Sequence, residues 1–266
     1  WPEGVNGGNP VPATDPVYFA WGQGGAIWTN YGAGSIALTY PPPSNITTYN
    51  TDLVTCYPPS GGVVIQAGVA VGNGGQIYRS STTMTSSAPS DINTIEASGT
   101  FADLYSVASD IGYVDNTSAA NPIYFVAVGT GGTILVNYRT FNVTGNATSR
   151  TIGSVNSVSS WTTGVSGTIN SLNSVTNNAF SVNRATNWTI VGDGGVVLTA
   201  NNSPGSGPGA WTSRTSNTTR NLNGVAECNG YTLAVGDAGT IIYSTDYGQT
   251  WTSPLSNPAR SEERRV

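Results

Sequence analysis

The chain has 266 residues, a length that fits one large all-β domain or two small ones. Only 9% of the residues are charged, all nine basic residues are arginines and the net charge is −5, so neither nucleic acid nor an anionic membrane is expected as a partner. The sequence contains no histidine and only two cysteines, which excludes a Ser-His-Asp triad, a Cys-His pair and a histidine-ligated zinc site.

Five glycine-rich turns divide the chain into similar segments. Each turn has the form Gly-x-x-Gly between two short apolar runs, a pattern that predicts a β-hairpin. In chain order, the hairpins cover residues 20–27, 70–77, 127–134, 190–197 and 234–241. Their first glycines lie 44 to 63 residues apart, and such a period indicates a repeat architecture.

Two further strands complete each segment. A strand of the form Leu-x-x-Val precedes the hairpin, and a short strand that begins at a tryptophan follows it. The first covers residues 2–5, 53–56, 104–107, 172–175 and 222–225; the second opens at Trp161, Trp211 and Trp251, with residues 35–40 and 94–97 in its place in the first two segments. We therefore expect an all-β fold, a single five-bladed β-propeller of four-stranded antiparallel blades over residues 1–255, followed by a short polar C-terminal tail over residues 256–266.

This pattern resembles the Asp-box (BNR-type) propellers, a group that includes sialidases, and it is most similar to propellers of the photosystem II assembly-factor type. The resemblance is carried by Leu-x-x-Val, by Ala-Val-Gly-x-x-Gly-x-Ile, and by the one complete Asp-box, which ends in the Asp-x-Gly-x-x-Trp of residues 246–251. It covers nearly the whole chain and implies the propeller fold. Function is left open, because this fold carries binders, scaffolds and hydrolases alike.

The Asp-box aspartate, Asp246, could be a turn former, a calcium ligand or a catalytic carboxylate. We favour the turn: Asp246 can accept hydrogen bonds from turn amides, Gly248 can supply a positive φ, and Trp251 can cover the base of the hairpin. Asp193 and Asp237 align with glutamine, asparagine and threonine in other segments, so they are expected to be turn formers as well. No metal ion or cofactor is expected.

Catalysis is the alternative hypothesis. A sialidase would need three convergent arginines, and the available ones fall at different positions within their segments: Arg79, Arg139, Arg150, Arg184, Arg214 and Arg220. A five-bladed glycoside hydrolase would instead use carboxylates around the axis. Asp52 and Asp103 precede Leu-x-x-Val in neighbouring segments, and Glu227 lies on the first strand of the last one, so these three are the catalytic candidates.

Secretion is predicted from glycosylation sequons. Seven Asn-x-Ser/Thr sequons occur, at Asn45, Asn116, Asn142, Asn146, Asn187, Asn201 and Asn217. All but Asn45 and Asn217 fall on the face of the disc where long insertions are expected, including a loop over residues 138–153. Cys56 and Cys228 fall on this face in the second and last blades, and we expect them to form a disulfide because secreted chains rarely keep free thiols.

The favoured function is therefore a non-enzymatic, secreted, N-glycosylated propeller with a structural or adhesive role at the cell surface, such as a self-assembling filament or coat subunit. Self-association with other copies and a glycan or cell-surface partner are expected, without a membrane span, since the longest apolar runs are too short for one. A lectin or glycoside hydrolase is the alternative. The chain opens at Trp1 without a signal sequence, which favours a processed chain or a fragment.

Overall fold

The structure is a computed structural model of the whole chain. It describes residues 18–21, 27–31, 35–39, 50–56, 65–80, 92–110, 122–146, 149–177, 186–202, 207–228 and 230–253. These residues form β-strands and four single-turn 3-10 helices, with no α-helix in the described ranges. The prediction of an all-β fold is confirmed.

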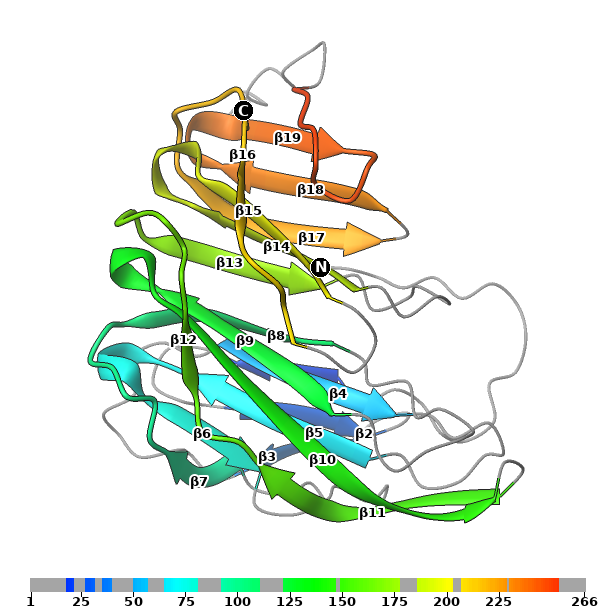
Figure 1. Cartoon of the computed structure of the whole chain (residues 1–266). Coiled ribbons are helices and arrows are strands. Elements are labelled where there is room, and N and C mark those ends of the chain that lie inside the picture. Colours follow the sequence, from blue (N-terminus) through cyan, green and yellow to red (C-terminus); the bar gives the residue numbers. More distant parts are fainter. Residues whose placement is uncertain are drawn as a thin grey trace, which may run out of the picture.

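The strands form five antiparallel sheets, named blades 1 to 5 here (Figure 1). Blade 1 contains β1 (Tyr18–Trp21), β2 (Ile27–Tyr31) and β3 (Ser35–Thr39). Blade 2 contains β4 (Asn50–Cys56), β5 (Ile65–Val71), η1 (Asn73–Gly75), β6 (Ile77–Ser80) and β7 (Ile92–Glu96). Blade 3 contains β8 (Leu104–Ser109), β9 (Ile123–Gly129), η2 (Thr130–Gly132), β10 (Ile134–Asn146), β11 (Ser149–Val158) and β12 (Thr162–Gly164).

The last two blades follow the same plan. Blade 4 contains β13 (Leu172–Asn177), β14 (Thr186–Gly192), η3 (Asp193–Gly195), β15 (Val197–Asn202) and β16 (Thr212–Arg214). Blade 5 contains β17 (Leu222–Cys228), β18 (Tyr231–Gly236), η4 (Asp237–Gly239) and β19 (Thr240–Ser244), and Thr252 adds a bridge to Tyr243. Four strands per blade were predicted; blades 2 and 4 have four, blade 3 has five, and the described parts of blades 1 and 5 have three.

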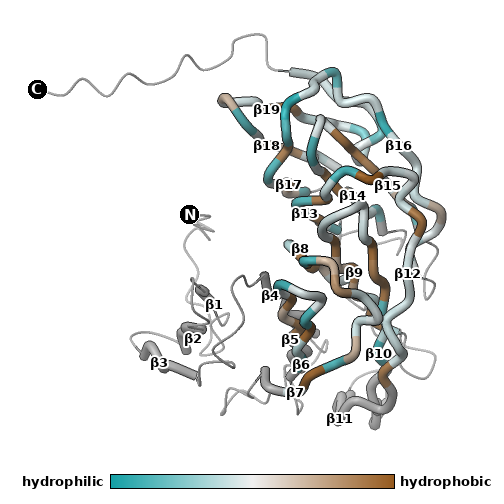
Figure 2. Tube along the Cα trace, turned by 90° about the vertical axis from the view of Figure 1, so that its left-hand side faces the viewer, coloured by the Kyte–Doolittle hydropathy of each residue, from teal (hydrophilic) through white to brown (hydrophobic). Residues whose placement is uncertain are grey.

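The blades stack side by side through their first strands. Strands β4, β8, β13 and β17 contact one another in that order, and the later strands of each sheet extend outwards from them (Figure 2). This is the radial arrangement of propeller blades. The described residues do not show a closed ring.

Apolar side chains fill the spaces between consecutive blades. Val69, Val71 and Ile77 of blade 2 pack against blade 3, and Val126, Val128 and Ile134 of blade 3 pack against blade 4. Val191 and Val197 of blade 4 pack against blade 5. In each case the following blade contributes the tryptophan that precedes its last short strand or, in blade 5, the bridge at Thr252: Trp161, Trp211 and Trp251. The described faces between blades 2 and 5 are therefore covered by neighbouring blades rather than by a second layer.

The segment expected as a long loop over residues 138–153 is a β-hairpin instead. Strand β10 continues to Asn146 and pairs with β11, with register shifts near Phe141 (Figure 1). The prediction of a loop was wrong. Apolar residues alternate with polar ones along this segment, and such alternation favours a strand. Val143, for example, pairs with Ile152 of the partner strand. Sequons Asn142 and Asn146 therefore lie in β10.

A close backbone contact fixes the turn between the second and third strands. In blade 3, Gly131 and Gly132 both have positive φ, of 64° and 72°. A Cβ atom on Gly132 would lie 2.0 Å from the carbonyl oxygen of Thr168, whereas one on Gly131 would meet nothing within 4 Å. Blade 5 has Ala238 at the position of Gly131, with φ of 54°. Only the second glycine is therefore demanded by packing.

This difference gives a matched pair of substitutions. Gly131→Ala should lower the free energy of unfolding by about 1 kcal/mol, the cost of a left-handed alanine. Gly132→Ala should lower it by about 1–3 kcal/mol more, because Thr168 and the blade connection must move. Denaturant unfolding of both variants measures the difference; equal losses would contradict the role of the contact.

Candidate functional site

The Asp246 carboxylate is used inside its own turn. Its Oδ1 accepts hydrogen bonds from the backbone N–H groups of Gln249 and Thr250, at 3.1 and 2.9 Å, and from the Ser244 hydroxyl, at 2.7 Å. Its Oδ2 accepts one from the Thr250 hydroxyl at 2.7 Å. These hydrogen bonds outweigh the opposing effect of burial and lower the pKa of Asp246 to about 2. The carboxylate stays ionised and holds the turn.

The neighbours of Asp246 complete the same turn. Gly248 has φ of 76°, and its N–H donates to the Ser244 hydroxyl at 2.9 Å. The Trp251 indole N–H donates to the Gly248 carbonyl at 2.9 Å, and Trp251 is buried against blade 4. The arrangement provides a rigid corner in which both carboxylate oxygens of Asp246 accept hydrogen bonds from the turn itself.

Asp103 links two blades. Its Oδ1 accepts a hydrogen bond from the N–H of Gly74 in blade 2, at 2.8 Å, and its carbonyl accepts one from the N–H of Thr130 in blade 3, at 2.9 Å. Asn221 does the same between blades 4 and 5: its side-chain oxygen accepts from the Gly194 N–H at 2.9 Å, and its carbonyl accepts from the Asp237 N–H. An amide thus serves in the same place as the carboxylate, so the geometry of Asp103 is that of an inter-blade link.

Asp52 is not at the position equivalent to Asp103. It lies within β4 and pairs with Val69, whereas Asp103 precedes β8. The sequence alignment placed Leu53 beside Leu104, but Leu104 pairs with Gly129 at the hairpin turn and Leu53 pairs with Gly68, farther from it. The assumption of matching positions was wrong because register is set by pairing along the whole strand.

Several candidate side chains lie outside the described residues. The backbones of Asp52 and Cys56 are described in β4, and that of Cys228 ends β17, but their side chains are not. The Cys56–Cys228 disulfide stays a prediction. Asn45 and Asn116 are also outside the described ranges, as are Arg184 and the C-terminal residues 254–266.

Glu227 is the exception among the described carboxylates. It lies in β17 opposite Thr232 of β18, and both of its side-chain oxygens are buried without a hydrogen-bond partner among the described residues. The Thr232 hydroxyl and the Thr189 hydroxyl of blade 4 are buried and unpaired in the same way. Burial raises the pKa of Glu227 to about 7. A carboxyl group with such a pKa could donate or accept a proton near neutral pH.

The structure also reveals a buried ionic cluster that the sequence analysis did not identify. Glu96 of β7 forms an ion pair with Arg79 at 2.8 Å. It also accepts hydrogen bonds from Arg139 at 3.3 and 3.4 Å and from the indole of Trp161 at 2.8 Å. Arg139 is 1% exposed and stacks over the ring of Phe125. Burial lowers the pKa of Arg139 to about 10, so the guanidinium remains charged. Two arginines considered for a sialidase triad are thus bound to Glu96 between blades 2 and 3.

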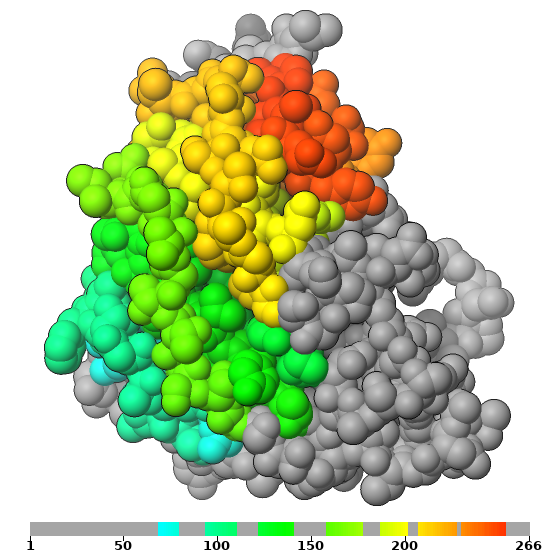
Figure 3. Space-filling view, viewed as in Figure 1, coloured from blue at the N-terminus to red at the C-terminus, as the bar shows by residue number. Residues whose placement is uncertain are grey.

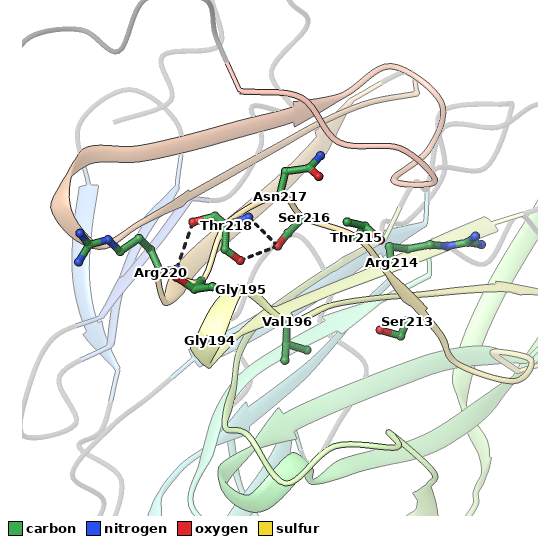
Figure 4. A pocket seen from close by; sticks show the side chains of 11 residues that line it. Gly194, Gly195, Val196, Ser213, Arg214, Thr215, Ser216, Asn217, Thr218 and Arg220 are labelled. Atoms are coloured by element: carbon green, nitrogen blue, oxygen red, sulfur yellow. Dashed lines mark hydrogen bonds between the residues drawn. The ribbon is translucent and has the colours of Figure 1, made fainter.

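An open depression lies on the outer part of blade 4, over residues 194–196 and 213–220 (Figure 4). Its central groups hydrogen-bond to one another: the Ser216 hydroxyl donates to the Thr218 carbonyl, and the Thr218 hydroxyl accepts from the Arg220 N–H. Arg214 and Arg220 point in opposite directions (Figure 4). The depression therefore has no convergent set of polar groups for a small ligand.

The described residues contain no group of three or more aspartate, glutamate or cysteine side chains placed to hold a metal ion. Within the same ranges, no helix has the length and apolar character needed to cross a membrane.

The raised pKa of Glu227 gives a test with a defined sign. Because the folded pKa of about 7 exceeds the ordinary value of 4.5, the folded protein binds more protons than the unfolded chain between these pH values. Stability from this group is therefore lost as the pH rises from 4.5 to 7. Glu227→Gln should raise the melting temperature relative to wild type by a few degrees at pH 8, and by much less at pH 5.

Thr232→Val is the control for this experiment. It removes an unpaired hydroxyl from the same part of the interface but does not titrate, so its effect should be the same at both pH values. Thermal unfolding of the three proteins decides the point. A wild-type-to-Gln difference that does not change with pH would show that Glu227 is ionised and solvated in the folded state.

No protein-family model matches the sequence, and no curated protein is similar to it. Among solved structures, YCF48 from Cyanidioschyzon merolae is 13% identical to this chain with a TM-score of 0.42. The matched region covers 92% of this chain and 87% of the YCF48 chain. YCF48 bound to D1 peptide is 12% identical with a TM-score of 0.41. Here the matched region covers 89% of this chain and 76% of the YCF48 chain. Trypanosoma rangeli sialidase is 12% identical with a TM-score of 0.45. The matched region covers 84% of this chain but only 40% of the sialidase chain. At these values the likenesses assign no function, and the propeller interpretation rests on the blades themselves.

Proposed function

We propose that the chain is a non-catalytic five-bladed disc, secreted and N-glycosylated, that has a structural or adhesive role at the cell surface and self-associates there. The non-catalytic part of the proposal is supported by the hydrogen bonds and ion pairs that the described carboxylates make. Every one of them except Glu227 accepts a hydrogen bond or an ion pair within the repeat: Glu96, Asp103, Asp110, Asp193, Asp237 and Asp246. These contacts hold turns, strands and neighbouring blades in place.

The alternative is a carbohydrate-active protein that uses Glu227. Its raised pKa suits a general acid, and it lies on a first strand, the part of a blade nearest the axis. Hydrolysis of a sugar bond needs a second carboxyl group facing the first. Among the described residues, burial is the cause of the raised pKa of Glu227, and none of them supplies a second carboxyl group beside it, which favours the structural role.

Two of the sequons, at Asn201 and Asn217, differ in how accessible their side-chain nitrogens are to a sugar. Asn201 is exposed near the end of β15, so its side-chain nitrogen is accessible for a sugar. Asn217 has a positive φ of 59°, and its side-chain nitrogen donates a hydrogen bond to the Trp251 carbonyl at 2.9 Å. A sugar would replace one of the two hydrogens on that nitrogen and crowd this link between blades 4 and 5. Asn187 pairs directly with Asn201, so glycans on both would crowd each other.

Secretion of the full chain by a glycosylating host tests this proposal. Glycopeptide mass spectrometry should find sugar on Asn201 and none on Asn217. The Asn201→Gln variant should lose one glycan while keeping the melting temperature of the deglycosylated wild type. A secreted chain with the mass of the bare polypeptide would contradict the glycoprotein assignment.

Self-association is tested through the C-terminal tail, which holds five of the chain's charged residues in its last seven positions. We expect residues 258–266 to dock on a neighbouring copy, with Arg260, Arg264 and Arg265 pairing with acidic groups. Deletion of these residues should leave a folded monomer by analytical ultracentrifugation. An unchanged oligomer after deletion, or a full-length monomer at high concentration, would remove the main support for a filament or coat.

A further inference from the structure

The tight turns and the connections between blades form one edge of the molecule. In blades 3, 4 and 5 the first strand begins beside the turn that joins the second and third strands, as the pairs Leu104–Gly129, Leu172–Gly192 and Leu222–Gly236 show. These turns lie at the left of Figure 1. We call the surface formed by η1 to η4 and by residues 97–103, 165–171 and 215–221 the turn edge.

Large apolar side chains project from equivalent places on the turn edge. Phe101 is 96% exposed and Ile169 is 89% exposed. Each directly follows the threonine of a Ser-Gly-Thr sequence, in the connection that leads into the next blade. Val165 lies just before the second of these sequences and is 83% exposed. Apolar residues that are this exposed and recur at the same place in successive blades indicate a contact surface.

Hydrogen bonds fix the connections that carry these side chains. In the first connection, the Ser98 hydroxyl donates to the Thr100 carbonyl at 3.1 Å, and the Thr100 hydroxyl accepts from the Ala102 N–H at 3.1 Å. The second connection repeats both hydrogen bonds. The carbonyl oxygen of each threonine also lies against the second glycine of the neighbouring turn. The exposure of Phe101 and Ile169 is therefore a consequence of an ordered backbone.

The turn edge also carries negative charge. Asp103, Asp193 and Asp237 each accept a hydrogen bond from an amide through Oδ1, and among the described residues none of the three forms an ion pair. Burial, followed by the carboxylates of Asp103 and Asp193, raises the pKa of Tyr105, so both of these charges lie near the same phenol. Arg220 is the basic residue within the ranges that define the edge. Its net charge is therefore negative.

The segment after Ser253 has a composition that complements this surface. Arginine suits a site that combines an aromatic ring with carboxylates, because the guanidinium group stacks on the ring and pairs with the acid. The protein already contains such a contact: Arg139 lies 4.8 Å from the centroid of the Phe125 ring and pairs with Glu96. The arginines of the segment are Arg260, Arg264 and Arg265.

The last described residues run towards the turn edge. Strand β19 begins at Thr240, next to η4, and runs away from the edge. Thr252 pairs antiparallel with Tyr243 of this strand, so the chain returns towards the edge as it reaches Ser253. Residues 254–266 could span about 40 Å if fully extended. The length and direction of the chain thus allow this segment to reach a disc that lies against the turn edge.

We propose that the turn edge is the docking surface for residues 258–266 of a neighbouring copy, with an arginine of that segment stacked on Phe101 and paired with Asp103. This inference rests on the proposed self-association and names the surface that receives the tail. The proposed glycans leave that surface accessible. Sequons Asn142 and Asn201 lie towards the far ends of β10 and β15, away from the turns at which these strands begin.

Substitution of the two exposed apolar residues tests the surface in the full-length chain. Phe101→Ser combined with Ile169→Ser should leave the melting temperature unchanged, because both side chains are exposed in the single chain. The dissociation constant of self-association, measured by analytical ultracentrifugation, should rise at least about tenfold through the loss of apolar burial. The control is Tyr231→Ser, which removes a 66% exposed side chain at the end of β18 far from the turn and should associate like wild type.

A second variant removes charge without removing hydrogen-bond acceptors. Asp193→Asn combined with Asp237→Asn keeps an oxygen for each amide donor, so the fold should be retained. Self-association should weaken roughly two- to thirtyfold at low salt, and its salt dependence should decrease. If the serine double variant and this one both associate like wild type, or if Tyr231→Ser weakens association as much as they do, the inference is wrong.

Cross-linking between two different chains distinguishes a neighbour from the chain's own tail. In full-length chains with Cys56→Ser and Cys228→Ser, one chain carries Ile169→Cys and the other carries Ser261→Cys. A short bismaleimide added to the mixture should join these two positions, as identified by peptide mass spectrometry. A cross-link that forms only when both substitutions are on one chain would show that the tail docks on its own disc and would overturn the inference.

Failure of this inference is distinguishable from failure of the proposed function. A wild-type chain that is monomeric at high concentration would refute self-association itself. A wild-type chain that associates through its tail, but is insensitive to the turn-edge variants, would overturn only the assignment of the docking surface.

Discussion

Burial of both faces of every sheet between neighbouring blades is the constraint on which this structure depends. A single sheet has no second layer of its own, so its apolar residues leave water only when another blade lies against them. Trp188 illustrates the result: it belongs to blade 4, is fully buried, and lies in one apolar cluster with Val126 and Val136 of blade 3. In the space-filling view, the surfaces of blades 3, 4 and 5 adjoin one another in that order (Figure 3). The outer face of blade 5 is the place where the same constraint is still unmet.

Polar residues serve this stacking rather than oppose it. Ser106 and Ser174 accept hydrogen bonds from the backbone N–H groups of Val175 and Val225 on the next first strand. Asp103 and Asn221 connect successive turns, and Glu96 joins blades 2 and 3 through two arginines and a tryptophan. A buried ion pair adds less stability than its Coulomb energy implies, because both ions lose water. Its geometry does fix how the two blades align.

The interface between blades 4 and 5 differs from the one before it. The position of Trp188 is taken by Thr232, and the valines that face Trp188 are replaced by Thr189 and Thr199. Gly248 of the Asp-box turn fits against these threonines, where a Cβ atom would lie 3.0 Å from the Thr189 hydroxyl. The Glu227 carboxyl group is buried beside Thr232, its cross-strand neighbour. The interface thus contains a rigid turn and a buried carboxyl group, and we expect its stability to depend on the charge of that group.

The sequence by itself determined the features that depend on a few adjacent residues. These are the glycine hairpins, the short strands that follow Trp161 and Trp211, the all-β class, and a turn in which Asp246 accepts hydrogen bonds from backbone amides. Only the tertiary structure decided the register of Asp52, the hairpin of β10 and β11, the Glu96 cluster and the raised pKa of Glu227. Glu96 and Arg139 are 43 residues apart, and no local pattern specifies that they meet. Turn chemistry and alternation are local properties, whereas register, burial and electrostatic environment depend on which distant strands come to lie together.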